Sequence, residues 1–154
     1  MSMVEKHLGA VHTKFKLNFY RQIFGHFAER EATLTAIETV CVEVIHALKS
    51  PTVNEFAEFL RISQANAAYK VGKLVEKGYV KKVQSEKDKR EFHVEVTDKF
   101  LEYYNLSSSF LKTMAARIEQ RFASDDLDKL NEILEVISDE LMPEVALRKN
   151  EYRF

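Results

Sequence analysis

The side chains with the clearest chemical potential lie between positions 64 and 90. Two amides, Gln64 and Asn66, open this stretch, and basic residues then recur every few positions. Residues 70–90 hold eight basic and three acidic side chains, a local net charge of +5, although the whole chain has a formal net charge of −1. Lysine and arginine neutralise phosphates, while an amide donates and accepts hydrogen bonds at one adenine edge. The stretch therefore has the chemistry to hold a polyanion and to distinguish bases.

A helix-turn-helix is predicted to position these side chains. Thr52 and Glu55 fit the capping box that begins a helix, predicted here over Val53–Leu60. Ser63 is placed to cap a second helix, predicted over Gln64–Lys77. Helical spacing places four residues of the second helix inside, namely Ala67, Val71, Leu74 and Val75. The residues left for the outside are Gln64, Asn66, Lys70, Lys73 and Lys77.

A β-hairpin is predicted to follow the second helix. Gly78 suits the left-handed residue that ends a helix. Strands are predicted over Tyr79–Gln84 and Glu91–Val96, with the tip at Ser85–Arg90. Apolar and polar residues alternate along the second strand from Phe92 onward, which indicates that one of its faces is buried. Two helices followed by such a hairpin have the layout of a winged helix-turn-helix.

Long helices are predicted for most of the remaining chain, because the sequence has only four Gly and two Pro. Apolar spacing and capping patterns predict helices over residues 4–26, from Thr35 to about Leu48, over Asp98–Phe122 and from a cap at Ser124 onward. Phe27–Thr33 is expected to be a connection, Ser107–Ser109 to loosen a helix, and Pro143 to kink or end the last one. The predicted fold class is mainly α with a small β-hairpin wing.

The first and last long helices carry apolar stripes that no predicted sheet can cover. In the first helix the stripe is Val4, Leu8, Val11, Phe15, Phe19 and Ile23. Helices of this kind bury their stripes against each other or against a second copy of the chain. Residues 1–33 and 98–154 are therefore predicted to form a helical homodimerisation region. It surrounds a winged lobe at residues 34–97, within a single domain that spans residues 1–154.

Four short motifs lie at the ends of these predicted elements. They are Glu76-Lys77-Gly78-Tyr79-Val80 after the second helix of the motif, Asp88-Lys89-Arg90 in the wing, Val96-Thr97 after it, and Leu34-Thr35 near the start of the lobe. With the order of the elements, they resemble the MarR family of bacterial winged helix-turn-helix transcriptional regulators. The resemblance covers nearly the whole chain. Arg61 stands at a turn where the family usually has Gly, and the start of the recognition helix is richer in alanine.

The chemistry and the resemblance together imply a set of DNA-binding residues. The predicted set is Ser63, Gln64, Asn66, Ala67, Tyr69, Lys70, Lys73, Lys87, Asp88, Lys89 and Arg90. Gln64 and Asn66 are predicted to read bases in the major groove, and Arg90 to enter the minor groove. Asp88 is predicted to accept hydrogen bonds from the Arg90 guanidinium. The alternative for each of these residues is an ordinary solvated surface.

Other residues suggest weaker sites. Phe15, Phe19, Phe56 and Tyr104 are weak candidates for lining a small-molecule effector pocket, and ordinary core packing is the favoured interpretation of these residues. No metal site is predicted, because the five histidines lack a close pair; if one exists, it should lie near Glu43 and His46. The single cysteine, Cys41, lies on an apolar helix face, which favours a buried structural residue over a redox sensor.

The sequence thus predicts a cytoplasmic regulator that binds double-stranded DNA sequence-specifically. It is expected to act as a homodimer on a pseudo-palindromic operator, as a repressor released by a small-molecule effector. The alternative is a winged-helix protein–protein interaction module without DNA binding. Neither an enzyme nor a cofactor is predicted, because the sequence has no Gly-rich phosphate loop or nucleophile motif. A membrane partner is not predicted, because charged residues interrupt the apolar positions near the N-terminus.

Overall fold

Seven helices and one two-stranded hairpin make up the part of the chain that the computed structural model describes, residues 1–29, 34–86, 88–107 and 109–145. In chain order they are α1 (Met3–Glu29), α2 (Ala36–Ala47), α3 (Val53–Leu60), α4 (Gln64–Glu76), β1 (Val80–Gln84), β2 (Phe92–Val96), α5 (Asp98–Ser107), α6 (Ser109–Arg121) and α7 (Ser124–Asp139). The predicted fold class, mainly α with a hairpin wing, is confirmed.

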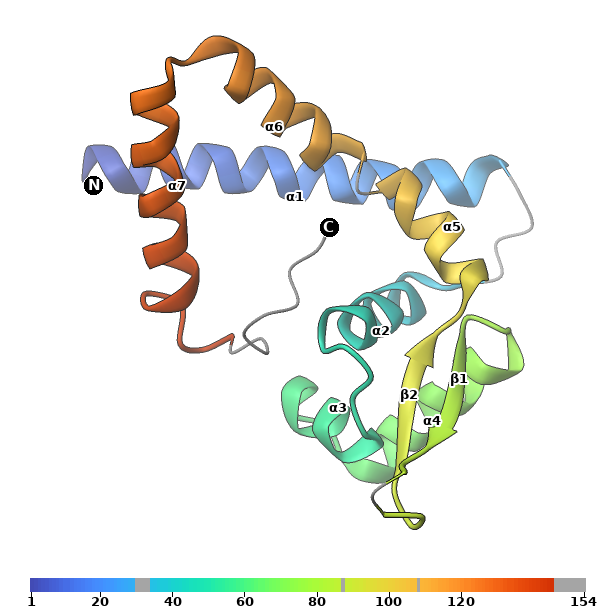
Figure 1. The fold of residues 1–154 in the computed structure, drawn as a ribbon. Helices are drawn as coiled ribbons and strands as arrows, with labels where there is room; N and C mark the ends of the chain where they lie inside the picture. The colour runs from blue at the N-terminus through green and yellow to red at the C-terminus, as the bar shows by residue number, and fades with distance from the viewer. Residues whose placement is uncertain (30–33, 87, 108, 146–154) are drawn as a thin grey trace.

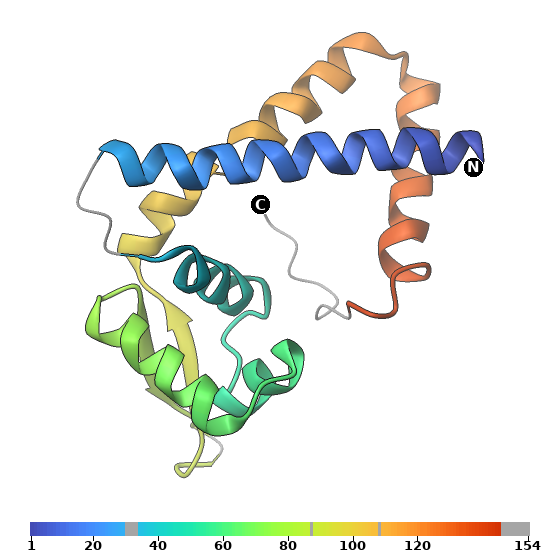
Figure 2. The same cartoon turned by 180° about the vertical axis from the view of Figure 1, so that it is seen from behind.

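Two regions are visible in Figure 1. The winged lobe consists of α2, α3, α4 and the hairpin, and the helical frame consists of α1, α6 and α7. Helix α5 connects the two regions. The tip of the hairpin lies at the end of the lobe farthest from the frame, and Figure 2 shows the same arrangement from behind. The tip of the wing and the frame therefore lie at opposite ends of the lobe.

One hydrophobic core holds the winged lobe together. Its buried members come from every element of the lobe and include Val42, Ile45, Phe56, Val71, Leu74, Val80 and Val94. Phe100, in the first turn of α5, is also fully buried in this core. Full burial of a side chain of this size contributes roughly 1.5–3 kcal/mol. The start of α5 is therefore fixed to the lobe.

Capping residues begin the helices of the lobe where the sequence predicts. In the capping box of α2, Thr35 donates its N–H to Glu38 Oε2 at 2.7 Å, and Glu38 donates its N–H to Thr35 Oγ1 at 3.2 Å. The same reciprocal pattern begins α3, and Ser63 caps α4. The predicted cap at Ser124 is wrong. Helix α7 begins one residue earlier, so Ala123 is the N-cap and supplies no side-chain hydrogen bond.

The turn between α3 and α4 uses a left-handed residue that is not glycine. Arg61 has φ 54° and ψ 43°, the left-handed conformation that glycine adopts most readily. This conformation costs a residue with a side chain roughly 1–2 kcal/mol. The N–H of Ile62 donates to the carbonyl of Ala57 at 3.0 Å, which closes the end of α3. Gly78 has φ 78°, so its predicted role at the end of α4 is confirmed.

The wing strands pair antiparallel, with Val80 opposite Val96. Each strand begins one residue later than the sequence predicts. Tyr79 donates its N–H to a carbonyl in the last turn of α4 at 3.0 Å, so it closes the helix instead of joining the strand. Glu91 donates its N–H to the carbonyl of Asp88 at 2.9 Å and belongs to the turn at the tip.

The second wing strand is half-buried, but its first residue is not. Val94 is fully buried, whereas Phe92 at the strand end is exposed. Val94 also donates its N–H to the carbonyl of Pro51 at 2.8 Å. The segment between α2 and α3 therefore pairs with β2 and fixes the wing to the helix-turn-helix.

The helices of the frame differ from the predicted ones at their ends. Helix α1 continues to Glu29, three residues past the predicted end, so only part of the expected connection remains, and residues 30–33 lie outside the described structure. The predicted helix over Asp98–Phe122 is divided into α5 and α6 around the three serines. Helix α7 ends at Asp139, before Pro143. None of the described helices is long and apolar enough to cross a membrane.

The frame buries little of its apolar surface within one chain. Helices α1 and α6 contact each other through Phe15 and Phe110, whose ring centroids lie 5.3 Å apart. No residue of α6 or α7 is buried. In α1, Val4 and Leu8 are exposed, as is Leu134 in α7. Part of each predicted stripe therefore remains exposed in the single chain.

Candidate nucleic-acid interface

The outer face of α4 presents the predicted base-reading residues to solvent. Gln64 and Asn66 are exposed, and the Tyr69 side chain is 65% exposed. Ala67 is completely buried in the lobe core, so its inclusion among the DNA-binding residues is wrong. Its inward position follows from the helical spacing. Val75, which was predicted to lie inside, is partly exposed instead.

The two amides differ in how they are held. Gln64 Nε2 donates to Asn54 Oδ1 on α3, and Asn54 Nδ2 in turn donates to Glu58 Oε1 at 2.9 Å. This chain orients the Gln64 amide before any ligand binds. Ser63 Oγ accepts the N–H of Asn66 at 3.2 Å, which leaves the hydroxyl proton available for donation. The start of α4 therefore presents hydrogen-bond donors in fixed positions.

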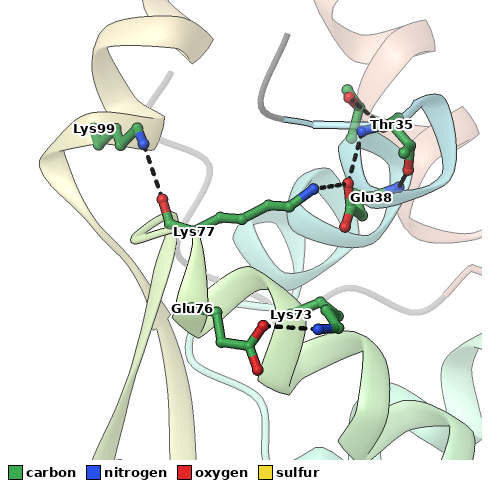
Figure 3. A network of polar contacts seen from close by, with 7 residues as sticks. Thr35, Glu38, Lys73, Glu76, Lys77 and Lys99 are labelled. Carbon is green, nitrogen blue, oxygen red and sulfur yellow. Dashed lines mark hydrogen bonds and ion pairs between the residues drawn. The ribbon is translucent and has the colours of Figure 1, made fainter. Parts of the chain in front are cut away.

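The lysines of α4 have different environments. Lys73 Nζ lies 2.8 Å from Glu76 Oε2 (Figure 3) and 5.9 Å from the centroid of the Tyr69 ring. The hydrogen bond to Glu76 raises the pKa of Lys73. Lys70 is half-buried on the same helix. Both lysines can pair with phosphate.

The wing tip is an ordered turn that carries Arg90. Asp88 Oδ1 accepts the backbone N–H of Arg90 at 2.9 Å, and the N–H of Asp88 donates to Ser85 Oγ at 3.3 Å. The predicted role of Asp88 therefore changes, because its carboxylate holds the backbone of Arg90 and not the guanidinium. Gln84 Nε2 also donates to the carbonyl of Lys89 at 2.6 Å. Lys87 lies outside the described residues.

An open groove separates the wing from the first turn of α3. The residues that line it are Thr52, Val53, Asn54, Lys82, Asp88, Arg90, Glu91 and Phe92. Two of them, Lys82 and Arg90, are basic, and sequence reasoning did not place Lys82 beside the wing tip. The pairing of Lys82 with Val94 in the hairpin register explains its position.

The four possible effector-binding residues fall into three places. Phe15 and Phe19 line a shallow hollow between α1 and α6, together with Phe110. Phe56 is fully buried in the lobe core, so its assignment to a pocket is wrong. Tyr104 packs against His46, with ring centroids 4.4 Å apart. The structure therefore brings only Phe15 and Phe19 together.

The half-buried carboxyl of Glu43 on α2 was considered from the sequence only as part of a possible metal site. Burial raises the pKa of Glu43 to about 7, and its Oε1 atom has no hydrogen-bond partner among the described residues. Its position between two apolar residues, Val42 and Val44, is the sequence signal. Burial lowers the pKa of His46, and the positive charge of Lys49 adds to this effect.

The described residues contain no cluster of three His, Cys, Asp or Glu side chains that could bind a metal ion. Cys41 is buried, and burial raises the pKa of its thiol. A reactive sensor thiol requires exposure and a lowered pKa. The predicted burial of Cys41 is confirmed.

Known proteins share this fold. FabT from Streptococcus pneumoniae, solved in complex with DNA, is 19% identical, with 89% of this chain and 96% of that chain covered and a TM-score of 0.61. A transcriptional regulator from Thermotoga maritima is 17% identical, with 87% and 93% covered and a TM-score of 0.63. The adhesin competence repressor from Streptococcus pyogenes is 18% identical, with 91% and 98% covered and a TM-score of 0.53. A search of curated proteins found no match.

The sequence also matches a family model directly. The matched segment, residues 34–92, begins just before α2 and ends at the first residue of β2. It contains the whole helix-turn-helix and the wing tip. The resemblance first noticed in short motifs is thereby confirmed. Residues 34–92 of this chain therefore match the MarR family, and the chain as a whole has a fold similar to that of MarR and of the Thermotoga regulator.

Proposed function

We propose that this protein is a transcriptional regulator that binds double-stranded DNA sequence-specifically. The observation that carries the proposal is the exposed face of α4, where Gln64, Asn66 and Tyr69 stand beside Lys70 and Lys73. A helix with this composition fits the major groove, where its amides reach base edges and its lysines reach phosphates. The family match and the DNA complex of FabT support the same reading. No catalytic step is part of the proposal.

The wing supplies the second contact. Arg90 lies at the tip, and the Asp88 carboxylate fixes its backbone while leaving its guanidinium extended toward solvent. A narrow minor groove attracts an arginine because the negative potential is concentrated there. Lys89 and Lys82 add positive charge near the flanking phosphates. The wing is therefore expected to add affinity and a preference for A·T-rich flanks.

The active form is a homodimer. The uncovered apolar residues of α1 and α7 are suited to pack against a second copy, since no other part of the described chain covers them. Two lobes related by twofold symmetry then read two half-sites about one helical turn apart, roughly 34–36 Å. A pseudo-palindromic operator follows from this symmetry.

Regulation is proposed to act through the spacing of the two lobes. The dimer represses by occupying its operator in the cytoplasm, and a small-molecule effector releases it by moving the frame helices. The hollow beside Phe15 and Phe19 is the proposed effector site, because it lies in the frame between α1 and α6. A shift that prevents both α4 helices from docking together abolishes tight binding.

Selection from a random-sequence duplex pool at two salt concentrations tests the proposal. The expected result is enrichment of an inverted repeat, with affinity that falls steeply as salt rises. Negligible binding even at low salt, with no enriched sequence, would contradict DNA recognition. A winged-helix module that pairs with another protein would then be the better account.

A further inference from the structure

Lys77, at the C-terminal end of α4, joins three parts of the chain. Its Nζ donates to Glu38 Oε2 in the first turn of α2 at 2.7 Å, and its carbonyl accepts a hydrogen bond from Lys99 Nζ in α5 at 2.9 Å (Figure 3). Glu38 Oε2 also accepts the N–H of Thr35 at 2.7 Å. We call Glu38, Lys77 and Lys99 the Lys77 clasp.

The ion pair of the clasp is better shielded than the other ion pairs of the described chain. The side chains of Lys77 and Glu38 are 31% and 16% exposed, compared with 40% and 66% for Lys73 and Glu76. Burial opposes the charge on Glu38, but hydrogen bonds from Lys77 and Thr35 outweigh it, so the pKa of Glu38 is lowered. Exposed ion pairs contribute little, whereas shielded, hydrogen-bonded ones fix geometry. Lys77 was predicted to face outward, and the structure turns its ammonium toward α2.

The clasp joins the end of α4 to the two helices, α2 and α5, at which the lobe is connected to the frame. Helix α2 begins directly after the segment that leads from α1, and α5 leads from the lobe to α6 (Figure 1). Thr97, the residue before α5, adds two hydrogen bonds to the same turn. Its Oγ1 donates to the carbonyl of Gly78 at 2.6 Å and its N–H to the carbonyl of Tyr79 at 3.0 Å. Lys99 Nζ also lies 4.4 Å from the centroid of the Tyr79 ring.

We propose that Glu38 and Lys77 are positioning residues for DNA recognition, which fix the direction of α4 relative to both connections with the frame. Lys77 acts in this way and not as a phosphate contact. The proposal rests on the proposed DNA-binding function and assigns to the clasp the step that carries a movement of the frame to α4. The ion pair lies at the C-terminal end of α4, and the base-reading residues lie at its N-terminal end. A small change in the direction of the helix at the ion pair therefore moves the base-reading end by a distance that grows with the length of α4.

The direction in which one substitution changes the affinity for DNA distinguishes this proposal from a simple electrostatic effect. Removing a carboxylate from a DNA-binding protein normally strengthens binding, because repulsion of the phosphates falls. Glu38→Gln removes the charge that holds Lys77, but glutamine can still accept the N–H of Thr35 in the capping box. The clasp predicts that this substitution weakens binding although it makes the protein more positive.

The experiment measures affinity for the selected inverted repeat, across a series of salt concentrations, for four variants and the wild type. Glu38→Gln and Lys77→Met are each expected to weaken binding about tenfold, or ~1.4 kcal/mol. The double variant should be no weaker than the single ones, since each breaks the same contact. The salt dependence should keep its slope. Glu76→Gln is the matched control on the same helix, and it should bind as tightly as the wild type or more tightly.

Two results would overturn the proposal. The first is unchanged or tighter binding by Glu38→Gln. The second is a salt slope reduced by about 0.9 in Lys77→Met, the value for one lost phosphate contact, which would make Lys77 a direct DNA ligand.

A measurement without DNA tests the clasp independently of the proposed DNA-binding function. Amide hydrogen exchange at Tyr79 and Thr97 is expected to become faster in both single variants, while the amide of Val71 in the core keeps its rate. If the wild type binds no DNA, the proposed function fails and the exchange result alone decides whether the clasp fixes α4. Unchanged exchange at these amides would contradict the clasp.

Discussion

The winged lobe and the helical frame differ in how much of their apolar surface they bury within one chain. The lobe closes a core within one chain, where Val42, Phe56 and Leu74 are completely buried. In the frame, α6 and α7 bury no residue, and Val4 of α1 is 74% exposed. The lobe therefore closes its core within one chain, whereas the frame leaves exposed apolar surface for the second copy that we propose. In the proposed function, DNA recognition belongs to the lobe, and regulation belongs to the frame, whose packing would be completed by assembly.

The largest expected effect lies in the core of the lobe. Phe56→Ala should destabilise the protein by about 3–5 kcal/mol, because it leaves a cavity beneath α3 that its neighbours cannot fill. Denaturant unfolding followed by circular dichroism measures the loss. Phe59→Ala on the same helix removes a ring that is partly exposed, and its effect should be much smaller. Equal losses for the two variants would show that the core is not where the structure places it.

A charge on the frame should break assembly and leave the lobe folded. Leu134→Glu places a carboxylate on the exposed apolar face of α7, so the homodimer should become a monomer in sedimentation at micromolar concentration. Affinity for an inverted repeat should fall by on the order of 10²-fold, because the second lobe is no longer tethered. Ile37→Glu is the control, since it makes the same change on an exposed residue of the lobe. A dimeric Leu134→Glu protein would place the interface elsewhere.

The buried carboxyl of Glu43 should make stability depend on pH. Its pKa is raised from 4.5 to about 7, so the folded protein binds this proton more tightly than the unfolded chain does. The contribution of Glu43 to stability should therefore be fully present below the unfolded pKa and be lost as pH rises through the folded pKa. The slope is at most about 1.4 kcal/mol per pH unit. Glu43→Gln should remove this dependence in denaturant unfolding between these pH values. An unchanged pH profile in the variant would refute the assignment.

The smallest effect is expected at the wing tip. Arg90→Ala should weaken DNA binding about tenfold, ~1.4 kcal/mol, with the loss concentrated on operators that have A·T-rich flanks. Binding to a set of operators that differ only in their flanks measures this. Arg121→Ala removes a similar charge from the frame and should have little effect. Full affinity in Arg90→Ala would exclude the minor-groove role.

Much of the lobe was predictable because its signals are local. Thr35 and Thr52 begin helices through contacts three residues away, and Gly78 ends one through its own backbone conformation. Such features depend on short stretches of sequence, so the pattern of residues determines them. Arg61 shows the limit of this reasoning, because the closing of α3 imposes a left-handed conformation that its residue type does not favour.

The remainder depended on contacts between distant parts of the chain. Phe56 was a weak candidate for a pocket beside the favoured interpretation of core packing, and the contacts that close the lobe core over it come from other elements. Lys77 was placed outside because its partner Glu38 lies 39 positions away. The shift of Asp88 from the guanidinium to the backbone of Arg90 depends on the detailed geometry of one turn. The positions of residues in helices and strands were therefore predicted better than the residues that they contact.

The central claim is that a frame-built dimer presents two rigid lobes to successive major grooves. The most direct test compares binding to the selected inverted repeat with binding to the same repeat after about 5 base pairs, half a helical turn, are inserted between its half-sites. The account predicts that the insertion reduces the affinity to that of a single half-site, because the second α4 then faces the wrong side of the duplex. Equal affinity for the two duplexes would contradict it.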